Sequence, residues 1–227
     1  MKVSMLAPEL ARYVERQLQA IFPDGRSLAT DVLARGTQEA LERVEHCFAP
    51  IVVKPYRAEG AINFDHLYSD QYLVFLWFLS SCIWSKTTDR IIANKIYLLN
   101  KALHGFDCSF DTSLPDVFIA LHGVGTVLGK ATYSDYLVVY QGCTVGQAHG
   151  RYPVLGRGVG LGAGATVLGH TVLGDYVSIG AGCTVTNMSV DGNSSVFRDD
   201  SGKLIVAPTR TQPIAADYFS AAALSRQ

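Results

Sequence analysis

The chain has 227 residues, of which 48% are hydrophobic and 17% charged, and its formal net charge is −1 at pH 7. This composition is typical of one or two ordinary globular domains, and it excludes the basic balance expected of a nucleic-acid-binding protein. The five cysteines show no CxxC spacing, so neither a disulfide framework nor a metal site is expected, and a reducing cytoplasm fits best.

The first 105 residues are expected to form a helical domain. Apolar residues recur at helical spacing over residues 7–22, before Pro23, and over residues 27–48, before Pro50. The first residues become amphipathic and charged at once, so no secretory signal is expected.

Two further helices are predicted after a connector over residues 51–68. The apolar run 72–84 is too short to span a bilayer, and it predicts a buried helix that starts near Ser69 and Asp70. The last helix is expected to be capped by Thr87 or Thr88 and to end at Gly105.

A six-residue period replaces the helical pattern over about residues 115–190. Between Leu155 and Val185 an aliphatic residue recurs every six positions, and glycine follows four of the first five. This period fits neither a helix nor a half-buried strand, but it fits a chain that turns a corner every six residues. The sequence therefore predicts a parallel β-helix of hexapeptide repeats, in which each coil buries its core by stacking on the next.

The repeat has an interruption and an end. Leu155 follows Val145 by ten positions instead of six, so an inserted loop should leave one edge of the coil. After residue 190 two short apolar runs flank residues 198–203 and predict a terminal hairpin, whereas the tail 215–227 is expected to be disordered. The same frame extends upstream of the loop, with inward positions at Leu121, Val127, Tyr133, Val139 and Val145.

Three segments resemble the serine acetyltransferase family: FDCSFDTSLPDVFIALHGVGTVLG, LVVYQGCTVG and PVLGRGVGLGAGATVLG. The resemblance covers about residues 106–185 well and the helical part in outline, and one coil looks a residue shorter near Lys130–Tyr133. It implies an α+β fold: an α-helical domain over 1–105, a left-handed parallel β-helix over 106–190, and a terminal hairpin and tail over 191–227.

The resemblance also implies an acetyl-CoA-dependent O-acetyltransferase that works by general-base catalysis. Asp107 precedes His122 by fifteen residues, as in the family. A hydroxyl needs a base to remove its proton, histidine suits this work, and a carboxylate on the second ring nitrogen would fix the tautomer. The alternative is that His122 is a surface histidine and Asp107 a turn residue.

The inserted loop supplies the candidate acceptor contacts. His149 is interpreted first as a substrate contact and second as a competing base, and Arg151 aligns with a family arginine that holds the serine carboxylate, although a solvated arginine is an equal alternative. Leu121 stands where the family has an aspartate that binds the serine amino group, and Tyr152 replaces a histidine. We therefore expect L-serine to be a poor acceptor and a sugar or another hydroxyl compound to be preferred.

The resemblance places acetyl-CoA along the coil, lined by Gly146, Ala163 and Ala181, although the corners require small residues there in any case. It further implies a homotrimer or a dimer of trimers. The charge balance and the short apolar run predict no nucleic-acid partner and no membrane span. Two alternative functions stay open: a sugar or amino-sugar acetyltransferase of surface-polysaccharide biosynthesis, and a non-catalytic β-helix scaffold.

Overall fold

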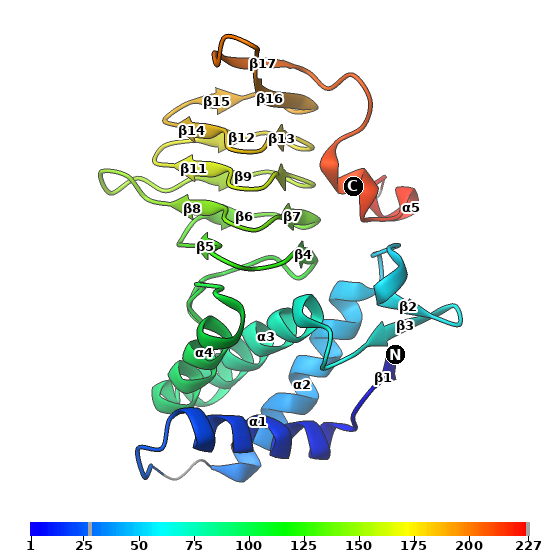
Figure 1. Ribbon diagram of the computed structural model, residues 1–227, viewed down its shortest axis with the longest axis vertical. Helices are drawn as coiled ribbons and strands as arrows, with labels where there is room; N and C mark the ends of the chain where they lie inside the picture. Colours follow the sequence, from blue (N-terminus) through cyan, green and yellow to red (C-terminus); the bar gives the residue numbers. More distant parts are fainter. Residues whose placement is uncertain (27–28, 226–227) are drawn as a thin grey trace.

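The computed structural model describes residues 1–26 and 29–225. A helical domain forms one end of the molecule, and a parallel β-helix stacks on it as a column of coils (Figure 1). The fold matches the predicted α+β class with a left-handed β-helix. Its helical domain contains α1 (Ala7–Ile21), α2 (Thr30–Phe48), α3 (Ser69–Thr87), α4 (Arg90–His104) and a small sheet of β1 (Lys2–Val3), β2 (Arg57–Ala58) and β3 (Ala61–Phe64).

The helix α3 is the core of the helical domain. It is buried on nearly all sides because α2 and α4 pack along it. The helix α1 packs on α2 and α4, and its apolar face buries Leu10, Val14 and Leu18. The second helix begins at Thr30, and the predicted positions 27 and 28 lie outside the described residues. No helix within the described ranges is long and apolar enough to cross a membrane.

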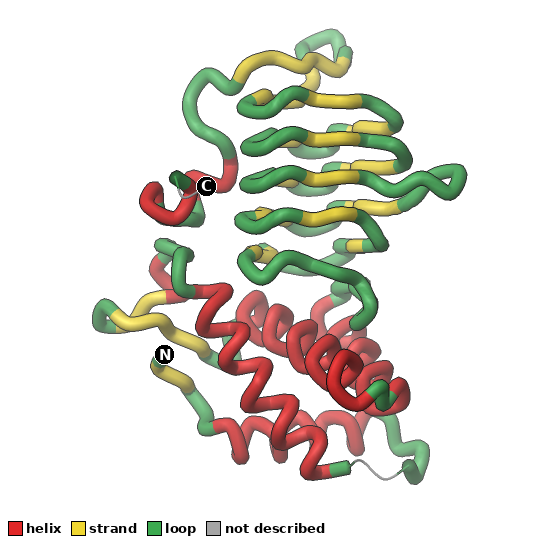
Figure 2. Tube along the Cα trace, turned by 180° about the vertical axis from the view of Figure 1, so that it is seen from behind, coloured by secondary structure: helices red, strands yellow, loops and turns green. Residues whose placement is uncertain are grey.

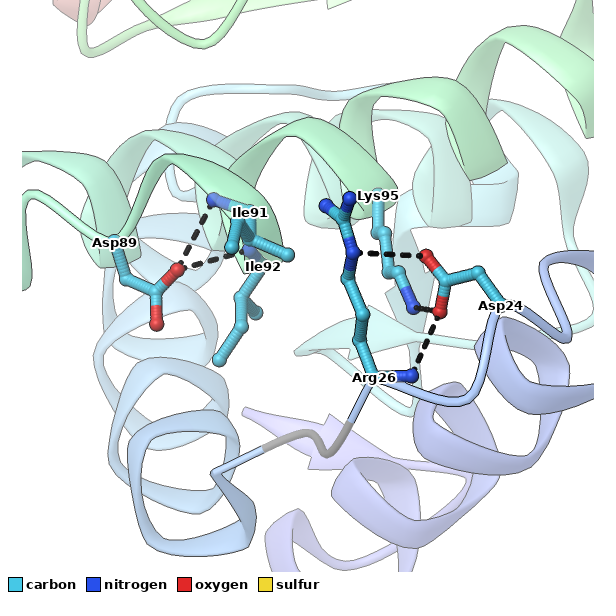
Figure 3. A network of polar contacts seen from close by, with 6 residues as sticks. All are labelled: Asp24, Arg26, Asp89, Ile91, Ile92 and Lys95. Atoms are coloured by element: carbon cyan, nitrogen blue, oxygen red, sulfur yellow. Dashed lines mark hydrogen bonds and ion pairs between the residues drawn. The ribbon is translucent and has the colours of Figure 1, made fainter.

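The start of α4 differs from the prediction. Asp89, rather than Thr87 or Thr88, caps this helix by accepting hydrogen bonds from the backbone N–H groups of Ile91 and Ile92 at 3.0 and 3.1 Å (Figure 3). Thr88 instead ends α3 in a left-handed conformation.

A buried lysine ties α4 to the segment that follows α1. The ammonium group of Lys95 donates to Asp24 at 2.6 Å, and Arg26 lies on the same carboxylate (Figure 3). Together these bonds hold the pKa of Asp24 below its usual value.

Three parallel sheets form the walls of the β-helix, as the stacked strands in Figure 2 show. Each coil contributes one short strand to each sheet. The first sheet holds β4 (Phe118–Ala120), β7 (Leu137–Val139), β10 (Gly160–Leu161), β13 (Ser178–Ile179), β16 (Ser194–Arg198) and β17 (Leu204–Pro208); the second holds β5 (Val127–Leu128), β8 (Thr144–Gly146), β11 (Thr166–Leu168) and β14 (Thr184–Thr186); the third holds β6 (Thr132–Tyr133), β9 (Val154–Leu155), β12 (Val172–Leu173) and β15 (Ser189–Val190).

The six-residue period corresponds to the inward positions of the regular coils. Every aliphatic residue of that series from Leu155 to Val185 is at most 1% exposed, and so are the small residues four positions after the first five. Leu161 pairs with Ile179 in register one coil above it, and Val167 pairs with Val185. The stacked side chains therefore form a single internal core.

The first coil departs from the predicted frame. Ala120, not Leu121, pairs with Val139, and Leu128, not Val127, pairs with Val145. Leu121 is accordingly only half-buried and Val127 is exposed. The prediction of inward positions at Leu121 and Val127 was wrong because the corner after β4 contains two extra residues, and the next corner, before Tyr133, is one residue short.

After the last coil the described residues form a hairpin and a returning tail, and the predicted positions 226 and 227 lie outside the described residues. The predicted hairpin is present, since β16 pairs with β17 in antiparallel register. The tail, expected to be disordered, instead runs back along the first sheet in a short helical turn (Ile214–Asp217) and α5 (Ala221–Leu224) (Figure 1). Ile214 packs over Gly160, and Arg157 donates to the carbonyl of Ala223 at 2.9 Å, so tertiary contacts order a segment that has no pattern of its own.

Candidate active site

His122 occupies the enlarged corner between β4 and β5. Its side chain is exposed and its backbone has φ of 61°, in the left-handed region that residues other than glycine seldom adopt. Gly123 and Gly125 follow it, also with positive φ. This sharply curved corner presents the imidazole to solvent.

The helical domain supports this corner from below. The carboxylate of Asp70, in the first turn of α3, accepts the backbone N–H of His122 at 2.9 Å and is only 4% exposed. Burial raises the pKa of Asp70, although this hydrogen bond and the nearby His122 oppose the shift. The sequence predicts only a helix start at Asp70, and no spacing pattern links it to residue 122.

Asp107 lies one layer below the coil of His122, as the fifteen-residue spacing predicts. Its backbone bridges to Val127, but its carboxylate accepts hydrogen bonds from Tyr97 and Lys101 of α4, both at 2.6 Å. Burial acts to raise the pKa of Asp107, but these two bonds hold it below its usual value. Within residues 1–26 and 29–225, no hydrogen bond or ion pair joins Asp107 to His122, so the structure does not bring the two side chains together.

A ladder of small residues rises from the His122 corner. Backbone hydrogen bonds connect successive corners along this edge: Gly142 to Val124, Gly164 to Gln141, and Gly182 to Ala163. Ala163 is half-buried and Ala181 exposed. Two of the three residues expected to line acetyl-CoA, Ala163 and Ala181, therefore share an edge with His122.

The other predicted residues lie across the second sheet from His122. Gly146 ends β8, and the inserted loop after it forms a narrow turn in which Ala148 and Arg151 exchange backbone hydrogen bonds at 3.1 Å. His149 and Arg151 are exposed, and Tyr152 is 49% exposed. The His122 corner comes just before β5, at the start of a strand of the second sheet, whereas the inserted loop comes just after β8, at the end of a strand of the same sheet. Because these strands are parallel, His122 and the loop residues lie on opposite sides of the second sheet within one chain.

The repeat segment matches a known family model. Residues 152–187 match the family model described as bacterial transferase hexapeptide (six repeats). Residues 152–187 therefore carry a hexapeptide repeat of this transferase type. The chain resembles serine acetyltransferases: the Synechococcus elongatus enzyme is 37% identical over 85 residues, which cover 35% of this chain and 35% of that relative. The matched segment thus spans only about a third of the relative's length.

Solved structures extend the likeness to the whole fold. The serine acetyltransferase of Neisseria gonorrhoeae superposes with a TM-score of 0.68, at 19% identity, over 93% of this chain and 83% of that one. The enzyme of Brucella abortus strain S19 gives 0.67, at 20% identity, over 89% and 84%. The arrangement of a helical domain on a hexapeptide coil is therefore that of the serine acetyltransferases.

Proposed function

We propose that the chain is an acetyl-CoA-dependent O-acetyltransferase with His122 as its general base. The observation that carries this proposal is the position of His122, exposed on a constrained corner at the foot of a ladder of small residues. Above the first coil the corner residues Gly142, Ala163, Gly164, Ala181 and Gly182 are small, so a long ligand can lie close to the backbone along this edge. The local sequence match to serine acetyltransferases supports the same chemistry.

The proposed reaction is direct transfer. The imidazole of His122 removes the proton of the acceptor hydroxyl as its oxygen attacks the thioester carbonyl. The carbon–sulfur bond then breaks, and the imidazolium returns the proton to the departing thiolate, giving an acetyl ester and free CoA. Asp107 is retained as the partner carboxylate in this scheme, in which it would have to exchange its bond with Lys101 for one with the imidazole.

The site is proposed to form between copies of the chain. His122 and the inserted loop flank opposite edges of the second sheet, so His149, Arg151 and Tyr152 would face the His122 of a neighbouring copy in a closed ring. A homotrimer, with or without pairing of trimers through the helical domain, satisfies this arrangement. Light scattering should show a trimer or hexamer at assay concentration, whereas an active monomer would contradict the proposal.

The acceptor is proposed to be a small hydroxyl compound other than L-serine. Leu121 is half-buried against the core and offers no carboxylate for an ammonium group. Tyr152, 49% exposed on the loop, offers a flat hydrogen-bonding surface of the kind that suits a sugar ring. The double variant Leu121→Asp, Tyr152→His should raise serine turnover relative to the wild type.

Release of CoA thiol with a panel of acceptors tests the function. The panel holds L-serine, other hydroxy amino acids, free sugars, amino sugars and nucleotide sugars. Acetylation of a sugar nucleotide would favour surface-polysaccharide biosynthesis, and efficient acetylation of serine alone would overturn the acceptor proposal. No release with any acceptor would favour a scaffold. The five buried, free cysteines support a reducing cytoplasm as the location of this activity.

A further inference from the structure

Asp70 is an unexpected residue in the core of the helical domain. The surrounding stretch of α3, including Tyr72, Leu73 and Phe75, is buried and mostly apolar, yet Asp70 lies among these side chains with 4% of its surface exposed. A buried carboxylate costs free energy unless a specific partner compensates it. The partner here is the backbone N–H of His122, 52 positions along the chain.

The His122 corner needs such a partner because its backbone is strained. A residue other than glycine held at positive φ is strained, and this conformation persists only where the surrounding structure enforces it. The helical domain supplies three restraints on this corner. They are the hydrogen bond to Asp70, the hydrogen bond from Gly125 to the carbonyl of Gly105 at 3.0 Å, and the close approach of Gly123 to Leu73.

We propose that Asp70 is a positioning residue that aims the imidazole of His122 through the hydrogen bond to its backbone. This inference rests on the proposed role of His122 as the base. Without the carboxylate the N–H of His122 loses its acceptor and the corner is free to leave the left-handed region. The imidazole would then shift, and a misplacement of about 1 Å costs on the order of 10²-fold in rate.

The role of Asp70 differs from that of Asp107. The carboxylate of Asp107 is engaged by Tyr97 and Lys101 of α4, whereas that of Asp70 contacts the residue of the proposed base directly. Asp70 acts on the backbone, so an uncharged acceptor of the same shape should replace it. An electrostatic role would instead require the negative charge.

Steady-state kinetics of Asp70→Ala and Asp70→Asn separate these roles. Asp70→Ala should lower kcat about 10²-fold and leave KM for acetyl-CoA within about twofold, because Ala163 and Ala181 are untouched. Asp70→Asn keeps an oxygen that accepts the His122 N–H and should retain most of kcat. Asp89→Ala is the matched control, since it removes a carboxylate that caps α4 and does not contact the corner.

Gly123→Ala and hydrogen exchange test the same role of the corner even if Asp70→Ala does not fold. Gly123→Ala would place a Cβ 2.3 Å from Leu73 Cδ1, so it should displace the same corner and lower kcat with Asp70 intact. Hydrogen exchange of a peptide covering residues 118–126 should accelerate in Asp70→Ala and stay as in the wild type in Asp70→Asn.

Two results would overturn the inference: an Asp70→Asn enzyme as impaired as Asp70→Ala, or an Asp70→Ala enzyme with wild-type kcat. A wild-type protein that releases no CoA with any acceptor would remove the proposed function. In that case hydrogen exchange at the corner would still report whether Asp70 holds His122.

Discussion

The first and third coils of the β-helix are built to different rules. In the third coil the inward residues Leu161, Val167 and Leu173 are six positions apart, and strands pair with it on both sides. In the first coil the inward residues Ala120 and Leu128 are eight positions apart, and Tyr133 follows five later.

The difference follows from what lies beneath each coil. The third coil stacks on another coil, so its shape repeats that of its neighbour. The first coil rests on the helical domain, where Phe118 packs edge-on against Trp77 and its backbone exchanges hydrogen bonds with Cys47. Below β4, side chains of helices replace a strand ladder, and below β5 there is a single-residue bridge from Asp107 to Val127. The corner between β4 and β5 therefore does not have to match a complete coil, and it is free to enlarge and carry His122.

The sharpest test of this comparison is removal of the imidazole from the irregular coil. His122→Ala should lower kcat about 10²–10⁴-fold because a general base is lost, with little change in melting temperature because the side chain is exposed. His170→Ala, an exposed histidine at a corner between the second and third sheets, serves as the control. A folded His122→Ala enzyme with normal turnover, together with an inactive His149→Ala, would name His149 as the base.

Acid should destabilise the helical domain on which the first coil packs, because His104 is buried there. Burial lowers the pKa of His104 to about 4, whereas an unfolded histidine titrates near 6.5. The unfolded state therefore binds the extra proton first, and stability should fall by up to about 3 kcal/mol as the pH drops from about 6.5 to 4.

Urea unfolding of the wild type and His104→Gln at pH 7 and pH 4.5 measures this effect. Glutamine can keep a hydrogen bond to Asn100, which now lies 2.8 Å from the His104 ring, but it does not titrate. The variant should thus lose less stability on acidification than the wild type. Equal losses in the two proteins would show that His104 is not responsible.

In the regular coils the corner glycines should be the sensitive positions. A Cβ on Gly174 would lie 2.5 Å from the backbone nitrogen of Gly192 in the coil above, so Gly174→Ala should cost about 1–3 kcal/mol. Gly146→Ala is the matched control, because its Cβ would meet only Leu168 at 3.6 Å. Denaturant midpoints would measure the difference, and similar values for the two variants would contradict close stacking.

The smallest expected effect concerns Asp107. Asp107→Ala should reduce kcat about tenfold, less than His122→Ala does, because its carboxylate is held by α4 rather than by the imidazole. Stability should change by less than about 1 kcal/mol, since the ion pair with Lys101 is partly exposed. A loss of kcat equal to that of His122→Ala would contradict this ranking and show that the imidazole cannot act as a base without Asp107.

The sequence predicted the structure of the regular coils, where one factor, the stacking of inward side chains, determines which residue type fits each position. A strict period of six can be satisfied only by a coil, and Leu155 to Val185 behave accordingly. The frame failed at Leu121 and Val127 because helices, which leave no six-residue signal, shape that coil. Asp70 was missed for a related reason: its partner is a backbone group distant in sequence, and no side-chain pattern records such a contact.

The returning tail has a consequence for how the molecule unfolds. Tyr218 accepts the backbone N–H of Val52 at 2.8 Å through its carbonyl and contacts the hydroxyl of Tyr140, while Ser220 donates to the carbonyl of Pro50 at 2.9 Å. The end of the chain thus fastens the connector before α3 to the wall of the coil. Loss of these contacts would expose both partners at once, so we expect the helical domain and the β-helix to unfold as one cooperative unit rather than separately.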